Sequence, residues 1–220
     1  MKLVENRYWI ISWVVLGMAI LSWGCQKDSV QPEANLPTVR ELSNEEQKLV
    51  RSVNNFAFDL VRQTTRQSSA QNVFLSPLSI NIAMSLMLNG SAESTRDQLY
   101  QSLDFEVLSP LEINKAYSEL IPFLQKLDPE VGFSLANAIW YDQRLSLSSF
   151  YQDILLAYYD AQTIDLNFRS KRAASTVQKW IEGQMPYKLA RPLSLPDARA
   201  KLYITNAVQF NGKWATPFRK

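Results

Sequence analysis

The stretch NVFLSPLSINIAMSLMLNG, residues Asn72–Gly90, decides how this chain is organised. Residues 72–75 form a short apolar run, which predicts a buried strand. Ser76 and Pro77 then start a helix, because a serine hydroxyl caps free backbone N–H groups and proline lacks the N–H that the first turn would leave unpaired.

The helix that follows has apolar residues on nearly every side, among them Leu78, Ile82 and Leu86. A helix that is apolar all round is buried. Asn89 and Gly90 predict that it ends in a left-handed turn. A strand that leads directly into a buried helix should form the spine of the core, with the other elements packed around it.

Three blocks of this sequence resemble the serpin family, in the same order and spacing. The segment NVFLSPLSINIAMSLMLNGSAESTRDQLYQSL, residues 72–103, is similar to the family signature Ser-Pro-x-Ser-Ile with its two helices. LANAIWYD, residues 135–142, resembles the second strand of the main serpin sheet, and LYITNAVQFNGKWATPF, residues 202–218, resembles the third strand and the turn after it. The resemblance runs from about Asn44 to Lys220 and covers roughly the N-terminal half of a family domain. It implies an α+β fold, with several helices packed on a mixed main β-sheet that is incomplete in this chain.

The resemblance also implies a function for the full-length parent, which is the inhibition of a serine or cysteine protease. In serpins a target protease cleaves an exposed reactive loop, and the loop then inserts into a metastable main sheet. That loop lies near the C-terminus of a serpin, so we expect no reactive loop among the residues up to Lys220. The family residues that can be carried over form the so-called shutter beneath the sheet opening, and here they are Ser76, Ser79 and Asn206. The same three residues could equally form a hydrogen-bonded core cluster without a specific function.

Two further hypotheses remain open at this stage. The chain could belong to a serpin that does not inhibit proteases and acts as a surface binding protein. It could also be a truncated product without a function of its own. The sequence downstream of Lys220 separates inhibition from binding, because a hinge rich in small residues favours inhibition, whereas charged residues or prolines favour binding.

The composition argues against an enzyme or a nucleic-acid-binding protein. Histidine is absent and Cys25 is the single cysteine, which excludes Ser-His-Asp, Cys-His and zinc chemistry and any disulfide within the chain. The net charge is +2, and no basic cluster suggests a nucleic-acid partner. We therefore expect no catalytic residue, no metal site and no cofactor.

The first 25 residues resemble a lipoprotein signal. Lys2 and Arg7 precede the apolar stretch 8–21, and Gly24 stands before Cys25 as in a bacterial lipoprotein cleavage box. An uncleaved anchor helix and an ordinary signal with a chance cysteine are the alternatives. We expect lipidation at Cys25, a protein held at the extracellular or periplasmic face of a membrane, and a disordered tether over residues 26–42.

The remaining predictions concern the domain of residues 43–220. Ser43 with Glu46, and Ser109 with Glu112, have the spacing of capping boxes and predict helix starts. The other predicted elements are strands over 131–141, 162–166 and 202–210, a helix capped by Ser148 with Phe150, Ile154 and Tyr158 facing inward, and a helix over 169–185.

Asn206 interrupts the apolar row of the last predicted strand. A buried amide is costly unless it finds partners, so we expect Ser76 or Ser79 within hydrogen-bonding distance of it. In this chain that strand should be an open edge, which predicts self-association. Asn211-Gly212 predicts a hairpin by local rules, whereas the resemblance sends residues 213–218 to another sheet, with Trp214 packed under the corner.

The segment 169–189 departs from the family pattern at two positions. Gln178 stands where serpins usually have asparagine, and Tyr187 stands where they usually have a turn glycine. A non-glycine residue there requires another backbone path. This departure bears on whether the preceding helix can shift aside during loop insertion.

Overall fold

The computed structural model describes residues 39–67, 72–185, 193–194, 199–214, 216 and 218. The helices are α2 (Asn44–Gln67), α3 (Pro77–Asn89), α4 (Glu93–Ser102), α5 (Pro110–Lys126), α6 (Ser149–Tyr159) and α7 (Ala173–Gln184). The strands are β1 (Gly132–Asp142), β2 (Ala161–Leu166) and β3 (Leu202–Asn211). All of these elements belong to one compact unit that begins at Leu36.

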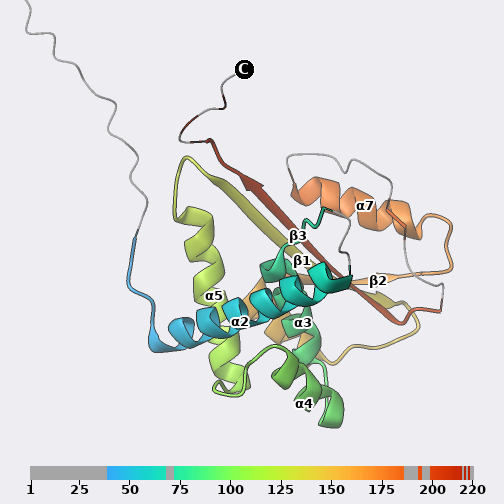
Figure 1. Ribbon diagram of the computed structural model, residues 1–220. Helices are drawn as coiled ribbons and strands as arrows, with labels where there is room; N and C mark the ends of the chain where they lie inside the picture. Colours follow the sequence, from blue (N-terminus) through green and yellow to red (C-terminus); the bar gives the residue numbers. More distant parts are fainter. Residues whose placement is uncertain are drawn as a thin grey trace, which may run out of the picture. The chain divides into compact units, whose positions relative to one another are not determined.

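The three strands form one mixed sheet in the order β2-β1-β3. β1 runs parallel to β2, which places α6 in the crossover between them, and antiparallel to β3. The register pairs Asn137 with Asn206 and Ile139 with Ile204. Figure 1 shows β1 and β3 as two long neighbouring strands that cross the domain.

Each face of the sheet packs on its own apolar cluster. The larger cluster contains Leu49, Ile82, Tyr117 and Ile139, and it lies between the sheet and helices α2 to α6. On the opposite face Ala138 and Trp140 pack against Val177 of α7, with the rings of Trp140 and Trp180 edge to face at 5.9 Å. In Figure 1, α7 lies on one side of the strands and α2, α3 and α5 on the other. Alternation along β1 therefore sends successive side chains into two separate cores.

The organising helix forms as predicted, but its two flanks differ from the prediction. Ser76 caps α3 through its hydroxyl, which accepts from the Ser79 backbone N–H at 3.4 Å. Residues 72–76 form no strand, and Phe74 is fully exposed. A strand needs a neighbour for its backbone groups, and none among the described residues pairs with this segment.

Gly90 ends α3 for a different reason from the one predicted. Its φ is −98°, which is not left-handed. A Cβ at this position would lie 2.9 Å from the ring of Tyr151, whose hydroxyl donates to the Leu86 carbonyl at 2.8 Å. Glycine is therefore required by the close approach of α6 to the end of α3.

The predicted capping box at the start of α2 is present. Ser43 Oγ accepts from the Glu46 N–H at 3.2 Å, and the Glu46 carboxylate accepts from the Ser43 N–H at 2.8 Å. The same carboxylate, which is inaccessible to solvent, accepts two hydrogen bonds from Arg40. The Arg40 guanidinium in turn lies 4.4 Å from the centre of the Phe123 ring of α5. Of the predicted tether, residues 39–42 are described, and within them Arg40 is held against the domain.

The inward face of α6 was predicted one residue out of phase. Leu155 and Tyr159 are buried, with Tyr151 packed beside them, whereas Phe150 is exposed. Ser148 precedes the helix, but its side chain makes no capping hydrogen bond. The stretch 149–159 is apolar on most sides, so sequence periodicity alone could not select the buried row.

β3 is an edge strand of the described sheet, as predicted. Phe210, Trp214 and Phe218 are largely exposed beyond it, and the rings of Trp214 and Phe218 contact each other at 5.2 Å. The predicted burial of Trp214 under a corner of the fold is therefore wrong. Neither the local hairpin nor a second sheet is formed by the described residues after Asn211. Self-association through this edge stays a prediction.

Several predictions lie outside the described residues, namely the signal over 1–25, Cys25, the tether up to residue 38, and Tyr187. No helix in the described ranges is long and apolar enough to cross a membrane. At the other departure from the family pattern, Gln178 Oε1 accepts from the Leu193 N–H at 3.1 Å, which ties α7 to the segment that follows it.

Glu46 should make the stability of the domain depend on acid. The hydrogen bonds from Arg40 hold the pKa of the Glu46 carboxyl below its usual value. A lowered folded-state pKa contributes stability that is present above the unfolded pKa and is lost as the pH falls through the folded one. We expect Glu46→Gln to lower the free energy of unfolding by about 1–3 kcal/mol at pH 7, and by less below about pH 4.

Urea unfolding at pH 7 and at pH 3.5 measures this difference. Glu45→Gln is the matched control, because Glu45 precedes Glu46 in the same helical turn and forms no ion pair within the described residues. Equal midpoints for the two variants at pH 7 would show that the Arg40–Glu46 pair does not hold the N-terminal segment.

Candidate functional site

The helix that starts after Ser76 and the edge strand β3 are joined by a side-chain hydrogen bond. Ser79 Oγ, in the first turn of α3, donates to Asn206 Oδ1 at the middle of β3. The expectation that Ser76 or Ser79 lies within reach of Asn206 is therefore met by Ser79. Ser76 is exposed and serves the N-terminal cap of α3. Of the three predicted site residues, the structure thus brings two into contact and leaves the third outside the cluster.

The second partner of Asn206 is Asn137, directly opposite it on β1. Asn206 Nδ2 donates to Asn137 Oδ1 at 2.6 Å, and Asn137 Nδ2 donates to the Tyr159 carbonyl at the end of α6, at 2.9 Å. Asn137 is 1% exposed. Both amides interrupt apolar rows at the same level of the sheet. Each supplies a hydrogen-bonding partner that the other requires because it is shielded from water.

Sequence reasoning identified Asn206 and missed Asn137. The signal was present, since Asn137 interrupts the row Phe133, Leu135, Ile139 just as Asn206 interrupts the row Ile204, Val208. Two strands that each place one asparagine in an apolar row can offset the cost of burying both amides by pairing them in register.

The polar cluster continues through the helices. The Tyr159 hydroxyl donates to Asn114 Oδ1 at 2.7 Å. Asn114 and Asn89 then exchange two amide hydrogen bonds, at 2.9 Å and 3.0 Å, and Asn89 also donates to the Ser85 carbonyl of α3 at 2.9 Å. A chain of hydrogen bonds therefore leaves α3 at Ser79, passes through β3, β1, α6 and α5, and returns to the end of α3.

Two buried tyrosines stabilise this arrangement without supplying acid–base chemistry. Tyr117 donates to Asn81 Oδ1, and its ring lies 5.4 Å from that of Tyr159. Burial raises the pKa of both phenols well above the ordinary tyrosine value. Both hydroxyls stay protonated at neutral pH and act as hydrogen-bond donors. Asn81 Nδ2 is buried without a partner in the described part of the chain, so this part of the cluster is held by packing as much as by hydrogen bonds.

The side chains of this site can hold two elements together through hydrogen bonds, which is not the chemistry of a catalyst. We call the hydrogen-bonded cluster of Ser79, Asn206 and Asn137 the latch. Its members are amides, hydroxyls and backbone carbonyls, with neither a charged group nor a nucleophile activated by a base. No group of three acidic, histidine or cysteine side chains that could hold a metal occurs among the described residues. What the site can do is hold β3 in one position against α3, and release it if the hydrogen bonds exchange partners.

A family model described as serpin (serine protease inhibitor) matches residues 51–220, most of the domain just described. The chain belongs to the serpin family. The α+β fold, with helices packed on a mixed sheet of three described strands, is consistent with an incomplete serpin fold.

Relatives whose names indicate different functions resemble this serpin about equally. A serpin-like protein of Methanosarcina acetivorans is 30% identical over 96% of this chain and 52% of that protein. Corticosteroid-binding globulin of Pongo abelii is 29% identical over 82% of the chain and 45% of the relative. Alpha-1-antiproteinase of Rattus norvegicus is 26% identical over 92% of the chain and 48% of the relative.

Solved structures show the same fold. Human thyroxine-binding globulin superposes with a TM-score of 0.72 at 22% identity, over 80% of this chain and 48% of that one. Human kallistatin gives 0.74 at 19% identity, over the same shares. The chain spans about half the length of the curated relatives it matches.

Removal of the Asn206 side chain should destabilise the domain, because it leaves the Ser79 hydroxyl and the buried Asn137 Oδ1 without the partners that Asn206 supplies. We expect Asn206→Ala to lower the free energy of unfolding by about 1–3 kcal/mol. Asn211→Ala is the matched control on the same strand, since Asn211 is exposed at its end. The measurement is chemical unfolding of the three proteins side by side. If Asn206→Ala unfolds at the same denaturant concentration as Asn211→Ala, the latch adds no stability.

Proposed function

We propose that this serpin, in its full-length form, inhibits a serine protease by insertion of a cleaved reactive loop into the sheet that contains β3. The chain of residues 1–220 would supply the part of the sheet that receives the loop and the latch beneath it. The protease would be recognised by residues outside this sequence, so the identity of the target is not part of the proposal.

The observation that carries this proposal is the position of the latch at the edge of the sheet. Among the described residues β3 pairs with β1, and β-sheets can take up an additional extended strand. Loop insertion in serpins is itself a known instance of strand addition. Ser79 and Asn137 hold Asn206 at the middle of that edge strand. Movement of β3 to admit a further strand would act directly on these bonds.

A second candidate function is the binding of a ligand or surface without inhibition. It is favoured by the family members that resemble this chain, since corticosteroid-binding globulin and thyroxine-binding globulin are named for what they carry. The departure at Tyr187 from the usual turn glycine points in the same direction, because it bears on the mobility of the helix before it. The third hypothesis, a product without function, predicts neither activity.

The deciding experiment uses protein expressed from the gene together with its downstream sequence. We expect incubation with trypsin, chymotrypsin or elastase to give, for at least one of them, a one-to-one covalent adduct that survives denaturing electrophoresis. The matched control is the same protease with its active-site serine blocked, which should give no adduct, as should residues 26–220 alone. Cleavage of the serpin by every protease without a trapped adduct would reject inhibition and favour the binding candidate.

We also propose that the chain is anchored to a membrane through a lipid on Cys25. Support comes from the apolar stretch 8–21, from Gly24 before the cysteine, and from the absence of any other cysteine. A membrane-held serpin would act on proteases near the cell surface, at the end of a tether of residues 26–42.

Cys25→Ser tests the anchor directly. The wild-type protein is expected to lose its first 24 residues and to partition into the detergent phase, because the lipid supplies the apolar surface. The variant should remain uncleaved or move to the aqueous phase. Ser22→Ala is the control inside the same segment. Unchanged processing and partitioning of Cys25→Ser would rule out lipidation.

A further inference from the structure

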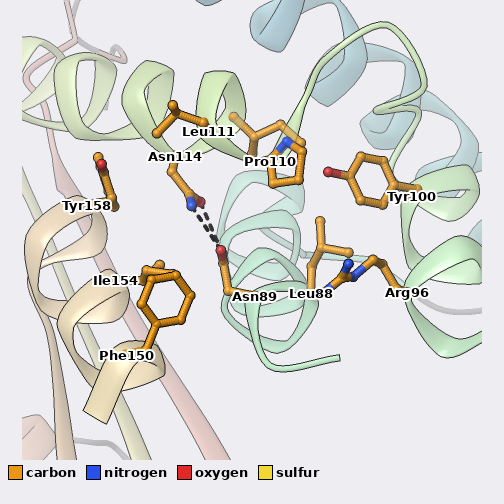
Figure 2. Close-up of a pocket in the computed structure, with 11 residues that line it drawn as sticks. Leu88, Asn89, Arg96, Tyr100, Pro110, Leu111, Asn114, Phe150, Ile154 and Tyr158 are labelled. Atoms are coloured by element: carbon orange, nitrogen blue, oxygen red, sulfur yellow. Dashed lines mark hydrogen bonds between the residues drawn. The ribbon is translucent and has the colours of Figure 1, made fainter. Parts of the chain in front are cut away.

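A cavity of about 330 Å³ opens between α3, α4, α5 and α6, away from the sheet. Its walls come from the end of α3, one side of α4, the start of α5 and the row of α6 that was predicted to face the core. The lining residues shown in Figure 2 include Leu88, Leu111, Phe150 and Ile154, which make most of the wall apolar. Leu111 and Phe150 are 51% and 73% exposed, so they lie at its mouth.

The row of α6 residues that was predicted from the sequence lines this cavity. Tyr151, Leu155 and Tyr159 face the core, and Tyr158 also packs against it. Phe150 and Ile154 lie on the neighbouring side of the same helix, where they line the cavity together with Tyr158. A helix with two adjacent apolar rows can bury one in the protein and offer the other to a ligand. Ligand sites in proteins are typically cavities of this size, with apolar walls and a few polar groups.

The polar side chains that line the cavity lie at two ends of it, and they differ in whether they already have hydrogen-bonding partners. Asn89 and Asn114 line it, but their amides are committed to each other and to Tyr159. Tyr100 and Arg96, both on α4, lie together at the other end, where the Tyr100 hydroxyl points toward the space beside Pro110 (Figure 2). The unoccupied polar groups are therefore confined to one end of an otherwise apolar cavity.

Both of these α4 side chains have hydrogen bonds left to donate. The Tyr100 hydroxyl is buried and has no partner among the described residues, and burial raises the pKa of this phenol, so it remains a donor. Arg96 uses Nε to donate to the Ser91 carbonyl at 3.2 Å, while no bond from its two terminal nitrogens is found within the described ranges. Arg96 is also the one charged side chain among the residues that line the cavity.

From this arrangement we propose that the cavity binds a small monocarboxylate with an apolar body. The carboxylate accepts hydrogen bonds from the terminal nitrogens of Arg96 and from the Tyr100 hydroxyl, for which it supplies the missing acceptor. The apolar body lies along Leu88, Ile154 and Phe150. A cationic or dianionic ligand does not fit, since the cavity offers one positive charge and no negative one. This site is independent of the proposed protease inhibition and uses no residue of the Ser79–Asn206 latch.

Octanoate is the probe, because it combines one carboxylate with a short apolar chain. Isothermal titration of the full 220-residue chain in a non-ionic detergent is expected to show saturable binding at one site. Octanol at the same concentration should not compete, because it lacks the charge that Arg96 recognises. Octanol that binds as tightly as octanoate, or that displaces it at equal concentration, would overturn the assignment of a carboxylate.

The variants test the two donors separately. We expect Arg96→Gln to weaken octanoate binding about tenfold to a hundredfold and Tyr100→Phe about threefold to tenfold. Arg51→Ala is the matched control, since Arg51 is an exposed arginine on α2 outside the cavity. Circular dichroism melting of each variant verifies its fold, and Arg96→Met serves in place of Arg96→Gln if that variant unfolds. Binding that Arg96→Gln leaves unchanged, or that Arg51→Ala weakens equally, would overturn the proposal.

Discussion

The amide pair Asn137 and Asn206 is the constraint on which the rest of this domain depends. Each asparagine stands in the apolar row of its strand, and each would cost free energy if the other were removed from hydrogen-bonding distance. The register between β1 and β3 follows from this pairing. A slip of β3 by one residue would send Asn206 to the opposite face of the sheet, where Trp140 and α7 lie, and would separate it from Asn137.

The pair also fixes how the sheet meets its helices. Ser79 takes the remaining acceptor of Asn206, and the Tyr159 carbonyl takes the remaining donor of Asn137. The first turn of α3 and the last residue of α6 are therefore located by polar contacts, while Ile82 and Leu155 fill the space between them with apolar surface. Burial supplies most of the stability of such a core, and the amides select one arrangement of it.

The same domain separates two kinds of site. The latch lies under the edge strand and consists of neutral groups whose hydrogen bonds can exchange, which suits a change in the position of β3. The cavity beside α4 has a mostly apolar wall and one positively charged side chain, Arg96, which suits the proposed ligand. Asn89 and Asn114 belong to the polar chain and also line the cavity. The Ser79–Asn206 hydrogen bond and the cavity thus lie at opposite ends of one helix, α3.

The sequence by itself determined the family, most of the element types and the starts of α2, α3 and α5. Ser43 with Glu46, and Ser109 with Glu112, cap their helices as the spacing predicts, because a capping box is satisfied within four consecutive residues. The alternation of β1 also predicted two faces of different character. Asn206 could be identified as a residue in need of a partner, since it interrupts an apolar row.

Only the tertiary structure decided which groups form hydrogen bonds with Asn206. Asn137, the true partner across the strands, lies 69 positions away along the chain, and nothing local to either residue identifies the other. The buried row of α6 depended on where α3 and α5 lie, and Gly90 is required by the ring of Tyr151 and not by its own backbone angle. The run 72–75 has the composition of a strand but no neighbour among the described strands. Local hydrogen bonds and periodicity are encoded within a few residues, whereas pairing and close approach depend on segments that only folding brings together.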